Sequence, residues 1–329
     1  MTMSQEYFLS LGPDGFHRLA YTDWGEPHNS HVVICVHGLS RNSRDFDWLA
    51  TALSTDVRVV CPDVVGRGES DWLQDRFAYC FPTYLSDAAA LVARVTVTPP
   101  QGHGQGLLAD LRDRLRGRPR DPAAPATLDW IGTSMGGLIG MLLAAKPGSP
   151  IRRLVLNDVG PFVPWAGLVR LKGHVGSDSS FADMDEVEKY FRRVCAEFGQ
   201  LDDAYWRQLA EHSVSLGEDG RYAVRYDPAI SRGLPVHMDP ELPIGPEFLR
   251  GIDLWNVWDA VDCPVLVLRG ADSQVLPREV VDEMKRRKPA LRVVEFPGVG
   301  HVPALATPDQ IEVIRDFLLS ELSPATQSD

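Results

Sequence analysis

The segment Gly132-Thr133-Ser134-Met135-Gly136 has residue types and spacing suited to nucleophilic chemistry. It lies between an apolar run at 127–131, which predicts a buried strand, and a helical pattern over 135–145. A G-x-S-x-G sequence in that context predicts a sharp, strained turn that lifts the serine hydroxyl above the edge of a sheet. The glycines remove Cβ atoms that would clash where strand and helix approach. We therefore interpret Ser134 as a nucleophile.

A serine hydroxyl is a weak nucleophile until a base takes its proton. His301 is the candidate base, because it lies in the loop 297–303, directly after a predicted strand at 291–296. Such a loop emerges at the same edge of a parallel sheet as the turn at Ser134. We expect the two side chains to meet there.

An acid must orient the imidazole and stabilise its charge once it is protonated. Asp272 is the first candidate, because it follows the penultimate predicted strand at 264–268 and should lie beside the His301 loop. Asp158 is a competitor: it follows the strand predicted at 151–157, at the same edge. The expected triad is Ser134–His301–Asp272, with Asp158 otherwise anchoring the entrance of an inserted segment.

The negative charge that develops on a reacting carbonyl oxygen needs preorganised donors. The backbone N–H of Met135, next to the nucleophile, and that of Leu39, in the loop His37-Gly38-Leu39-Ser40, are the candidates. His37 is interpreted as structural rather than as a second base. The candidate substrate-pocket residues are Phe162, Trp165, Val275 and Val302. The two aromatic ones could equally be hinge packing.

The elements that must position these residues alternate between strands and helices. A hairpin is predicted around the turn 12–15, followed by buried strands at 31–36 and 57–61 and a helix at 82–95. Further strands and helices follow, and a closing helix starts at Pro308 with Thr307 and Gln310 as a capping box. This alternation predicts an α/β fold with a mostly parallel sheet covered by helices on both faces.

Two segments interrupt the alternation. Residues 161–256 show helical apolar stripes and no clear buried strand, so we interpret them as a helical cap on a core formed by 1–160 and 257–329. The segment 99–125, rich in Pro, Gly and Arg, joins a helix end to a strand start and contains a possible helix at 107–115. It should leave from the edge of the sheet opposite Ser134, away from the chemistry.

Composition excludes several classes of function. The 329 residues carry a net charge of −12, which would repel nucleic acid. No stretch approaches the roughly 20 apolar residues of a membrane span, and the first residues do not resemble a signal peptide. Five scattered cysteines without metal-ligand spacing predict free thiols in a reducing cytoplasm, with no metal and no cofactor. A homo-oligomer is possible, and the expected partner is a small ester substrate.

The motifs together resemble the α/β-hydrolase superfamily, over the whole chain except the insertion. The residues that carry the resemblance are His37-Gly38, Asp63-x-x-Gly66-x-Gly68-x-Ser70, Ser134, Asp272 and Gly300-His301. Within it, the chain resembles compact bacterial-type esterases, enol-lactonases and carbon–carbon bond hydrolases with a helical cap. The resemblance implies hydrolysis of carboxylic esters or lactones, of small to medium apolar substrates, through an acyl-enzyme.

Other members of that superfamily give the alternatives. Dehalogenases and epoxide hydrolases of this fold use an aspartate nucleophile, and position 134 is serine. A carbon–carbon bond hydrolase of the meta-cleavage type remains an alternative, although Val302 follows His301 where those enzymes carry tryptophan. A ligand-binding module without activity is the non-enzymatic alternative, and labelling by a serine-reactive fluorophosphonate would distinguish it.

Overall fold

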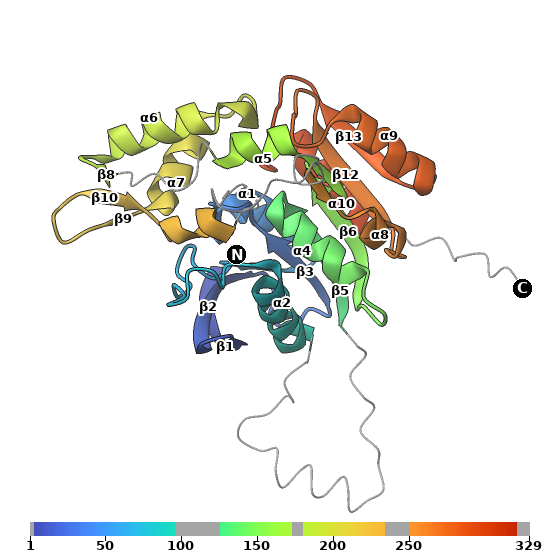
Figure 1. The fold of residues 1–329 in the computed structure, drawn as a ribbon, viewed down its shortest axis with the longest axis horizontal. Coiled ribbons are helices and arrows are strands. Elements are labelled where there is room, and N and C mark those ends of the chain that lie inside the picture. Colours follow the sequence, from blue (N-terminus) through green and yellow to red (C-terminus); the bar gives the residue numbers. More distant parts are fainter. Residues whose placement is uncertain (1–2, 97–125, 173–179, 234–250, 321–329) are drawn as a thin grey trace, which may run out of the picture.

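The structure is a computed structural model that describes residues 3–96, 126–172, 180–233 and 251–320. An eight-stranded sheet forms its centre (Figure 1). In chain order its strands are β1 (Met3–Gly12), β2 (Gly15–Trp24), β3 (His31–Val36), β4 (Arg58–Pro62), β5 (Thr127–Thr133), β6 (Ile151–Asn157), β12 (Val265–Gly270) and β13 (Arg292–Phe296). The predicted hairpin is present, and the predicted buried strands lie within two residues of their expected bounds.

The spatial order of the sheet is β1-β2-β4-β3-β5-β6-β12-β13. The first three strands pair antiparallel, and every pair from β4 to β13 is parallel. Because parallel strands end at one edge, the loops after β3, β5, β6, β12 and β13 emerge together. The predicted α/β fold with a mostly parallel sheet is confirmed.

Helices cover both faces of the sheet. They are α1 (Asp47–Leu53), α2 (Phe81–Thr96), α4 (Met135–Ala144), α8 (Trp255–Asp259), α9 (Arg278–Arg287) and α10 (Pro308–Leu319). Successive side chains of β3 point to opposite faces, so Ile34 joins the apolar cluster under α2, α4, α8 and α9, whereas Cys35 joins the cluster under α1 and α10. A strand buried on both sides is apolar along its buried length, as residues 32–36 of β3 are.

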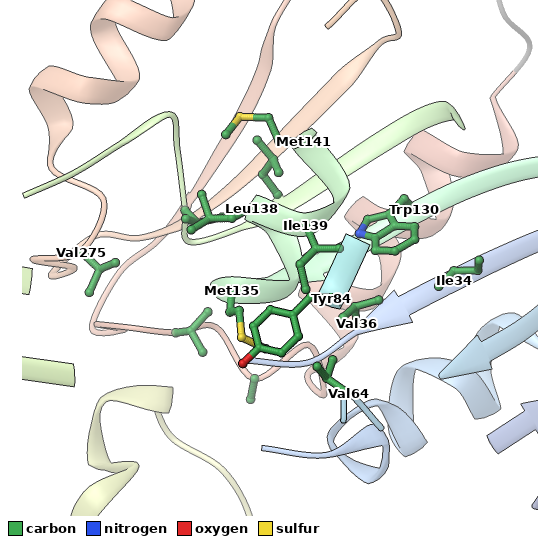
Figure 2. Close-up of a cluster of buried hydrophobic side chains, with 14 of the residues drawn as sticks. Ile34, Val36, Val64, Tyr84, Trp130, Met135, Leu138, Ile139, Met141 and Val275 are labelled. Atoms are coloured by element: carbon green, nitrogen blue, oxygen red, sulfur yellow. The ribbon is translucent and has the colours of Figure 1, made fainter. Parts of the chain in front are cut away.

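The contact between α4 and the sheet fixes the position of the nucleophile. Trp130 of β5 is fully buried and donates a hydrogen bond from its indole N–H to the carbonyl of Gly136, at 3.1 Å. A Cβ atom on Gly140 would lie 2.3 Å from that indole nitrogen, so the helix can approach only because the residue is glycine. Figure 2 shows Ile139 of α4 beside this tryptophan and Val36.

The chain leaves the core at β7 (Phe162–Pro164) and returns at β11 (Gly251–Asp253). These strands pair antiparallel, with Val163 opposite Ile252. The described elements between them are α5 (Trp165–Lys172), β8 (Ser180–Phe181), α6 (Met184–Val194), η2 (Ala196–Phe198), α7 (Asp203–Ser213), β9 (Val214–Leu216), β10 (Tyr222–Val224) and η3 (Pro228–Gly233). We call this segment the cap.

The cap contains the helices that the sequence predicted and also a small sheet that it did not predict. The apolar stripe of α6 is buried at Val187 and Phe191, as its helical spacing requires. A three-stranded antiparallel sheet, in the order β8-β10-β9, was not expected. Its strands are two or three residues long, which is too short for an alternating pattern to stand out.

The predicted insertion 99–125 and its possible helix 107–115 lie outside the described residues. The five cysteines lie within the described part of the chain and are all free. Among the helices that the structure describes, none has the length and apolar character that a membrane crossing requires.

Candidate active site

The turn between β5 and α4 is strained at Ser134. This residue has φ 50° and ψ −114°, a backbone conformation that a side chain other than hydrogen disfavours. The chain is crowded there: a Cβ on Gly132 would lie 2.3 Å from the backbone of Gly136, and one on Gly136 would lie 2.1 Å from the carbonyl oxygen of Val36. The two glycines thus let the strand, the helix and the neighbouring strand meet around one raised hydroxyl, as predicted.

The hydroxyl of Ser134 meets the imidazole of His301. Nε2 of His301 lies 3.1 Å from Oγ of Ser134. The histidine sits in the loop after β13, three strands away from β5 in the sheet. The distance places His301 within reach of the serine proton, which is the geometry a general base requires.

The expectation that Asp272 holds this imidazole is wrong. Oδ2 of Asp158 lies 2.7 Å from Nδ1 of His301, and Asp158 is fully buried. Asp272 is exposed, in a turn where its N–H donates to the carbonyl of Val299 at 2.9 Å. Both aspartates follow strands at the carboxyl edge, but β6 lies next to β5, so the loop after β6 enters the space beside Ser134.

The local backbone explains why Asp158 can reach inward. It has φ 53°, in the left-handed region where aspartate is better tolerated than most residues. Its carboxylate also accepts hydrogen bonds from the N–H of Gly270 at 3.0 Å and from the hydroxyl of Ser273 at 2.5 Å. These donors satisfy a buried carboxylate and fix the face that it presents to His301. Sequence reasoning did not identify Ser273.

The candidate donors for the oxyanion are Leu39 and Met135. Within the described residues, no acceptor takes the backbone N–H of either one. A hydrogen bond fixes the loop that carries Leu39, because the buried guanidinium of Arg67 donates to the Leu39 carbonyl at 2.8 Å. Leu39, Met135 and Ser134 also line one cavity together. Sequence reasoning did not identify Arg67, whose position in the Gly66-Arg67-Gly68 turn gave no separate signal.

His37 braces the same loop. Its Nδ1 lies 2.7 Å from the carbonyl of Gly38, and its Nε2 accepts the N–H of Val64 at 2.9 Å. Burial lowers the pKa of His37 to about 3, because the charged ring would be desolvated. The ring therefore stays neutral at physiological pH and holds a single tautomer, which agrees with its interpretation as structural.

Two cavities, each of about 310 Å³, meet at Ser134. The first, which we call the polar cavity, is bounded by His301 and by charged side chains of the core and cap, among them Arg41 and Arg193. The second, the apolar cavity, shares Leu39, Ser134 and Val275 with the first, and its walls also include Tyr84 and Leu138 (Figure 2). The first cavity thus combines charged side chains with apolar ones such as Phe191 and Val302, whereas the second is lined almost entirely by apolar and aromatic side chains.

The predicted pocket residues are divided by these cavities. Val275 borders both cavities, and Val302 borders the polar one. Phe162 and Trp165 border neither, so their assignment to the pocket is wrong. Phe162 pairs instead with Asp253 where the cap joins the core, and both aromatics pack against the main apolar cluster. These two aromatic side chains therefore fit the alternative interpretation, in which they pack where the cap joins the core.

No group of three or more His, Cys, Asp or Glu side chains in the described part of the chain has the arrangement of a metal site. The structure joins Ser134, His301 and Asp158 by hydrogen bonds at the site. A serine, a histidine and an aspartate at the carboxyl edge of a parallel sheet, with the serine on a strained strand–helix turn, define the serine hydrolase class of site.

The chain belongs to the alpha/beta hydrolase family, whose model matches residues 33–312. It is 39% identical over 311 residues to a 3-hydroxybutyrate-oligomer hydrolase from Cupriavidus necator, covering 93% of this chain and 94% of the relative. It is 25% identical over 295 residues to a 2-(acetamidomethylene)succinate hydrolase from Mesorhizobium japonicum, covering 89% and 90%. A solved alpha/beta hydrolase from Novosphingobium aromaticivorans matches with a TM-score of 0.74 at 33% identity, covering 97% of this chain and 99% of that one.

These matches confirm the predicted family and the predicted enzyme class, a hydrolase of carboxylic esters. They agree with a small-molecule substrate.

Proposed function

We propose that this enzyme cleaves the ester bonds of short oligoesters of hydroxyacids, of the 3-hydroxybutyrate kind, with Ser134, His301 and Asp158 as its triad. The 39% identity to a hydrolase of 3-hydroxybutyrate oligomers supports the substrate class, because the match extends over nearly all of both chains. The observation in the molecule that carries the proposal is the pair of unlike cavities that meet at Ser134.

The reaction begins when His301 Nε2 takes the proton of Ser134, and Oγ forms a bond to the ester carbonyl carbon. The carbonyl oxygen becomes negative and accepts from the N–H groups of Leu39 and Met135. Asp158 stabilises the imidazolium through Nδ1–H. The carbon–oxygen bond of the alcohol then breaks, and the imidazolium gives its proton to the departing oxygen. A water activated by His301 hydrolyses the acyl-enzyme in the same way.

A hydroxyacid oligoester suits these cavities better than a long-chain ester does. Each repeating unit is short, and the methylene and methyl branch beside its reacting carbonyl suit an apolar space of limited size, such as the cavity walled by Tyr84 and Leu138. The chain also ends in a carboxylate, which requires polar or charged surroundings. Both needs are met within reach of one serine.

The test is hydrolysis of the dimer and trimer of 3-hydroxybutyrate by the purified enzyme, followed as release of the monomer. We expect the wild-type enzyme to release the monomer from both oligomers. Ser134→Ala should lose several orders of magnitude of this activity, since removal of one triad member typically costs 10⁴-fold or more. Circular dichroism of the variant checks that it folds. If wild type hydrolyses p-nitrophenyl butyrate but leaves both oligomers intact, the substrate class is wrong. A few per cent of residual activity in the variant would exclude Ser134 as the nucleophile.

A further inference from the structure

The position of His301 decides which cavity receives which half of the ester. The group that protonates the departing alcohol must lie on the alcohol's side of the reacting carbon. His301 borders the polar cavity and is not part of the wall of the apolar one. The alcohol half of the substrate therefore leaves into the polar cavity. The acyl half stays in the apolar cavity, beside the oxyanion donor Met135.

Among the described residues, the acidic side chains and arginines that line the polar cavity are Arg41, Asp45, Arg193 and Glu197. Arg41 and Asp45 neutralise each other, because Nε and Nη2 of the arginine donate to the two carboxylate oxygens at 2.9 and 2.5 Å. Oε2 of Glu197 accepts the backbone N–H of His301 at 3.2 Å. These groups are occupied by neighbours.

Arg193 differs from them. It is exposed, and within the described residues no carboxylate pairs with it. Its guanidinium carbon lies 5.6 Å from the ring centroid of Tyr190, a contact that holds the side chain against the cavity wall. An arginine that faces an active-site cavity with its donors available is suited to bind a carboxylate in a bidentate manner.

We propose that Arg193 binds the free carboxylate of the leaving hydroxyacid, an inference that rests on the proposed function. In an oligoester of this kind, the alcohol half of the last ester bond is a single hydroxyacid with a free carboxylate. Placing that carboxylate at Arg193 aligns the last bond with Ser134. The enzyme then removes units one at a time from the carboxyl end of the oligomer.

The test compares the 3-hydroxybutyrate dimer with its methyl ester, which has the same internal ester bond and no free charge. We expect wild type to prefer the free acid, measured as the ratio of the two kcat/KM values. In Arg193→Gln this ratio should fall about tenfold, the effect of losing one charge-assisted hydrogen bond at an accessible site. Arg192→Gln is the matched control, because Arg192 is its neighbour on α6 but pairs with Glu188 and Asp203 outside the cavity. Its ratio should stay at the wild-type value, and an equal fall in both variants would overturn the proposal.

A second measurement tests the carboxylate-binding role of Arg193 independently of the proposed substrate class. Free 3-hydroxybutyrate should inhibit hydrolysis of p-nitrophenyl butyrate competitively in wild type and about tenfold more weakly in Arg193→Gln. Its methyl ester should inhibit both enzymes alike. If the inhibition follows this pattern but the oligomers are not hydrolysed, Arg193 binds a carboxylate and the proposed substrate class is wrong. If the oligomers are cleaved and the inhibition constants of the two enzymes are equal, the role of Arg193 is wrong and the proposed function remains.

Discussion

The carboxylate that orients His301 is buried and fully bonded. Asp158 accepts from the main chain of Gly270, from the hydroxyl of Ser273 and from the imidazole. An acid held by three donors has little freedom to rotate away from the ring. Its position depends on Gly270, the last residue of β12, and on Ser273 just after it, both more than a hundred positions further along the chain.

Substituting each of the two aspartates in turn tests this arrangement. Asp158→Asn should lower kcat on a small ester by roughly 10⁴-fold, the cost of presenting the wrong hydrogen-bonding partner to an imidazole in a triad. Asp272→Asn is the matched control and should stay within a few-fold of wild type, because its side chain is exposed. Steady-state kinetics on p-nitrophenyl butyrate measures both. The opposite order would return the role to Asp272.

His37 should make the stability of the protein depend on pH. Its pKa is about 3 in the folded state and about 6.5 when the chain is unfolded. As the pH falls below 6.5 the unfolded chain binds a proton that the folded ring refuses, so the free energy of unfolding decreases. The slope from this one group approaches about 1.4 kcal/mol per pH unit.

His37→Gln should remove that contribution, since an amide can donate and accept in place of the neutral ring but does not titrate there. Urea unfolding from pH 7 to pH 4 should therefore give a shallower loss of stability in the variant than in wild type. Parallel curves for the two proteins would contradict the buried, neutral state of His37.

The sequence was sufficient to predict that Ser134 and His301 lie together, but not which aspartate contacts the histidine. The serine carries a local signature, because a G-x-S-x-G turn needs its glycines at fixed positions. The two aspartates carry none: each follows a strand that ends at the same edge. Which of them reaches the imidazole depends on the order of strands in space and on the left-handed backbone at Asp158, and neither quantity is written in the local sequence.

At the scale of elements, the cap contacts the histidine loop through η2. The carbonyl of Glu197 accepts the N–H of Gly300 at 2.8 Å, and the Glu197 carboxylate accepts the N–H of His301. A Cβ atom on Gly300 would lie 2.8 Å from that carboxylate, so the cap fits closely over the loop. The cap therefore helps to hold the base, besides forming a wall of the polar cavity.

Removing the side-chain part of this contact should affect turnover. Glu197→Ala should lower kcat up to about tenfold, since one hydrogen bond that positions the base is worth about 0.5–1.5 kcal/mol. Glu197→Gln keeps an oxygen that accepts the same N–H and should recover most of the loss. Kinetics on p-nitrophenyl butyrate, with thermal unfolding as a check of the fold, compares the three proteins. An equal loss in Gln and Ala would point to the charge rather than to the hydrogen bond.

The core elements were predictable because their patterns are long and consistent. Strands of five to seven mostly apolar residues and helices of ten or more residues stand out in the sequence. Finer features did not follow. Thr307 is at the N-cap of α10 as expected, but it makes no side-chain capping bond, so the predicted capping box is wrong. Packing against the core decides such details after the helix has formed.

At the scale of the whole molecule, the chemistry is confined to one edge of the sheet. α2 ends at Thr96, and β5 starts at Thr127 and runs for seven residues to the turn at Ser134. A strand of that length spans about 20 Å. The segment that joins these two elements is thus attached at the edge opposite the serine.

Replacing residues 100–124 by a short Gly/Ser link should leave turnover of a small ester within a few-fold of wild type. Changing the length of a connection alters its closure entropy little, on the order of 0.6 kcal/mol per doubling of length. Kinetics on p-nitrophenyl butyrate and size-exclusion chromatography of the deletion variant measure activity and self-association. A large fall in turnover by a folded variant would show that the segment reaches the active site.

The short ladder between β7 and β11 has a consequence for how such enzymes diverge. It brings the two ends of the cap together, with Phe162 opposite Asp253, and the N–H of Leu254 donates to the carbonyl of Pro161 at 2.7 Å. Everything between those two points can lengthen, shorten or be replaced without moving the strands that carry Ser134, Asp158 and His301. Descendants of one ancestral core can therefore exchange caps as modules, provided that each new cap replaces the contacts that Glu197 makes with the loop of His301.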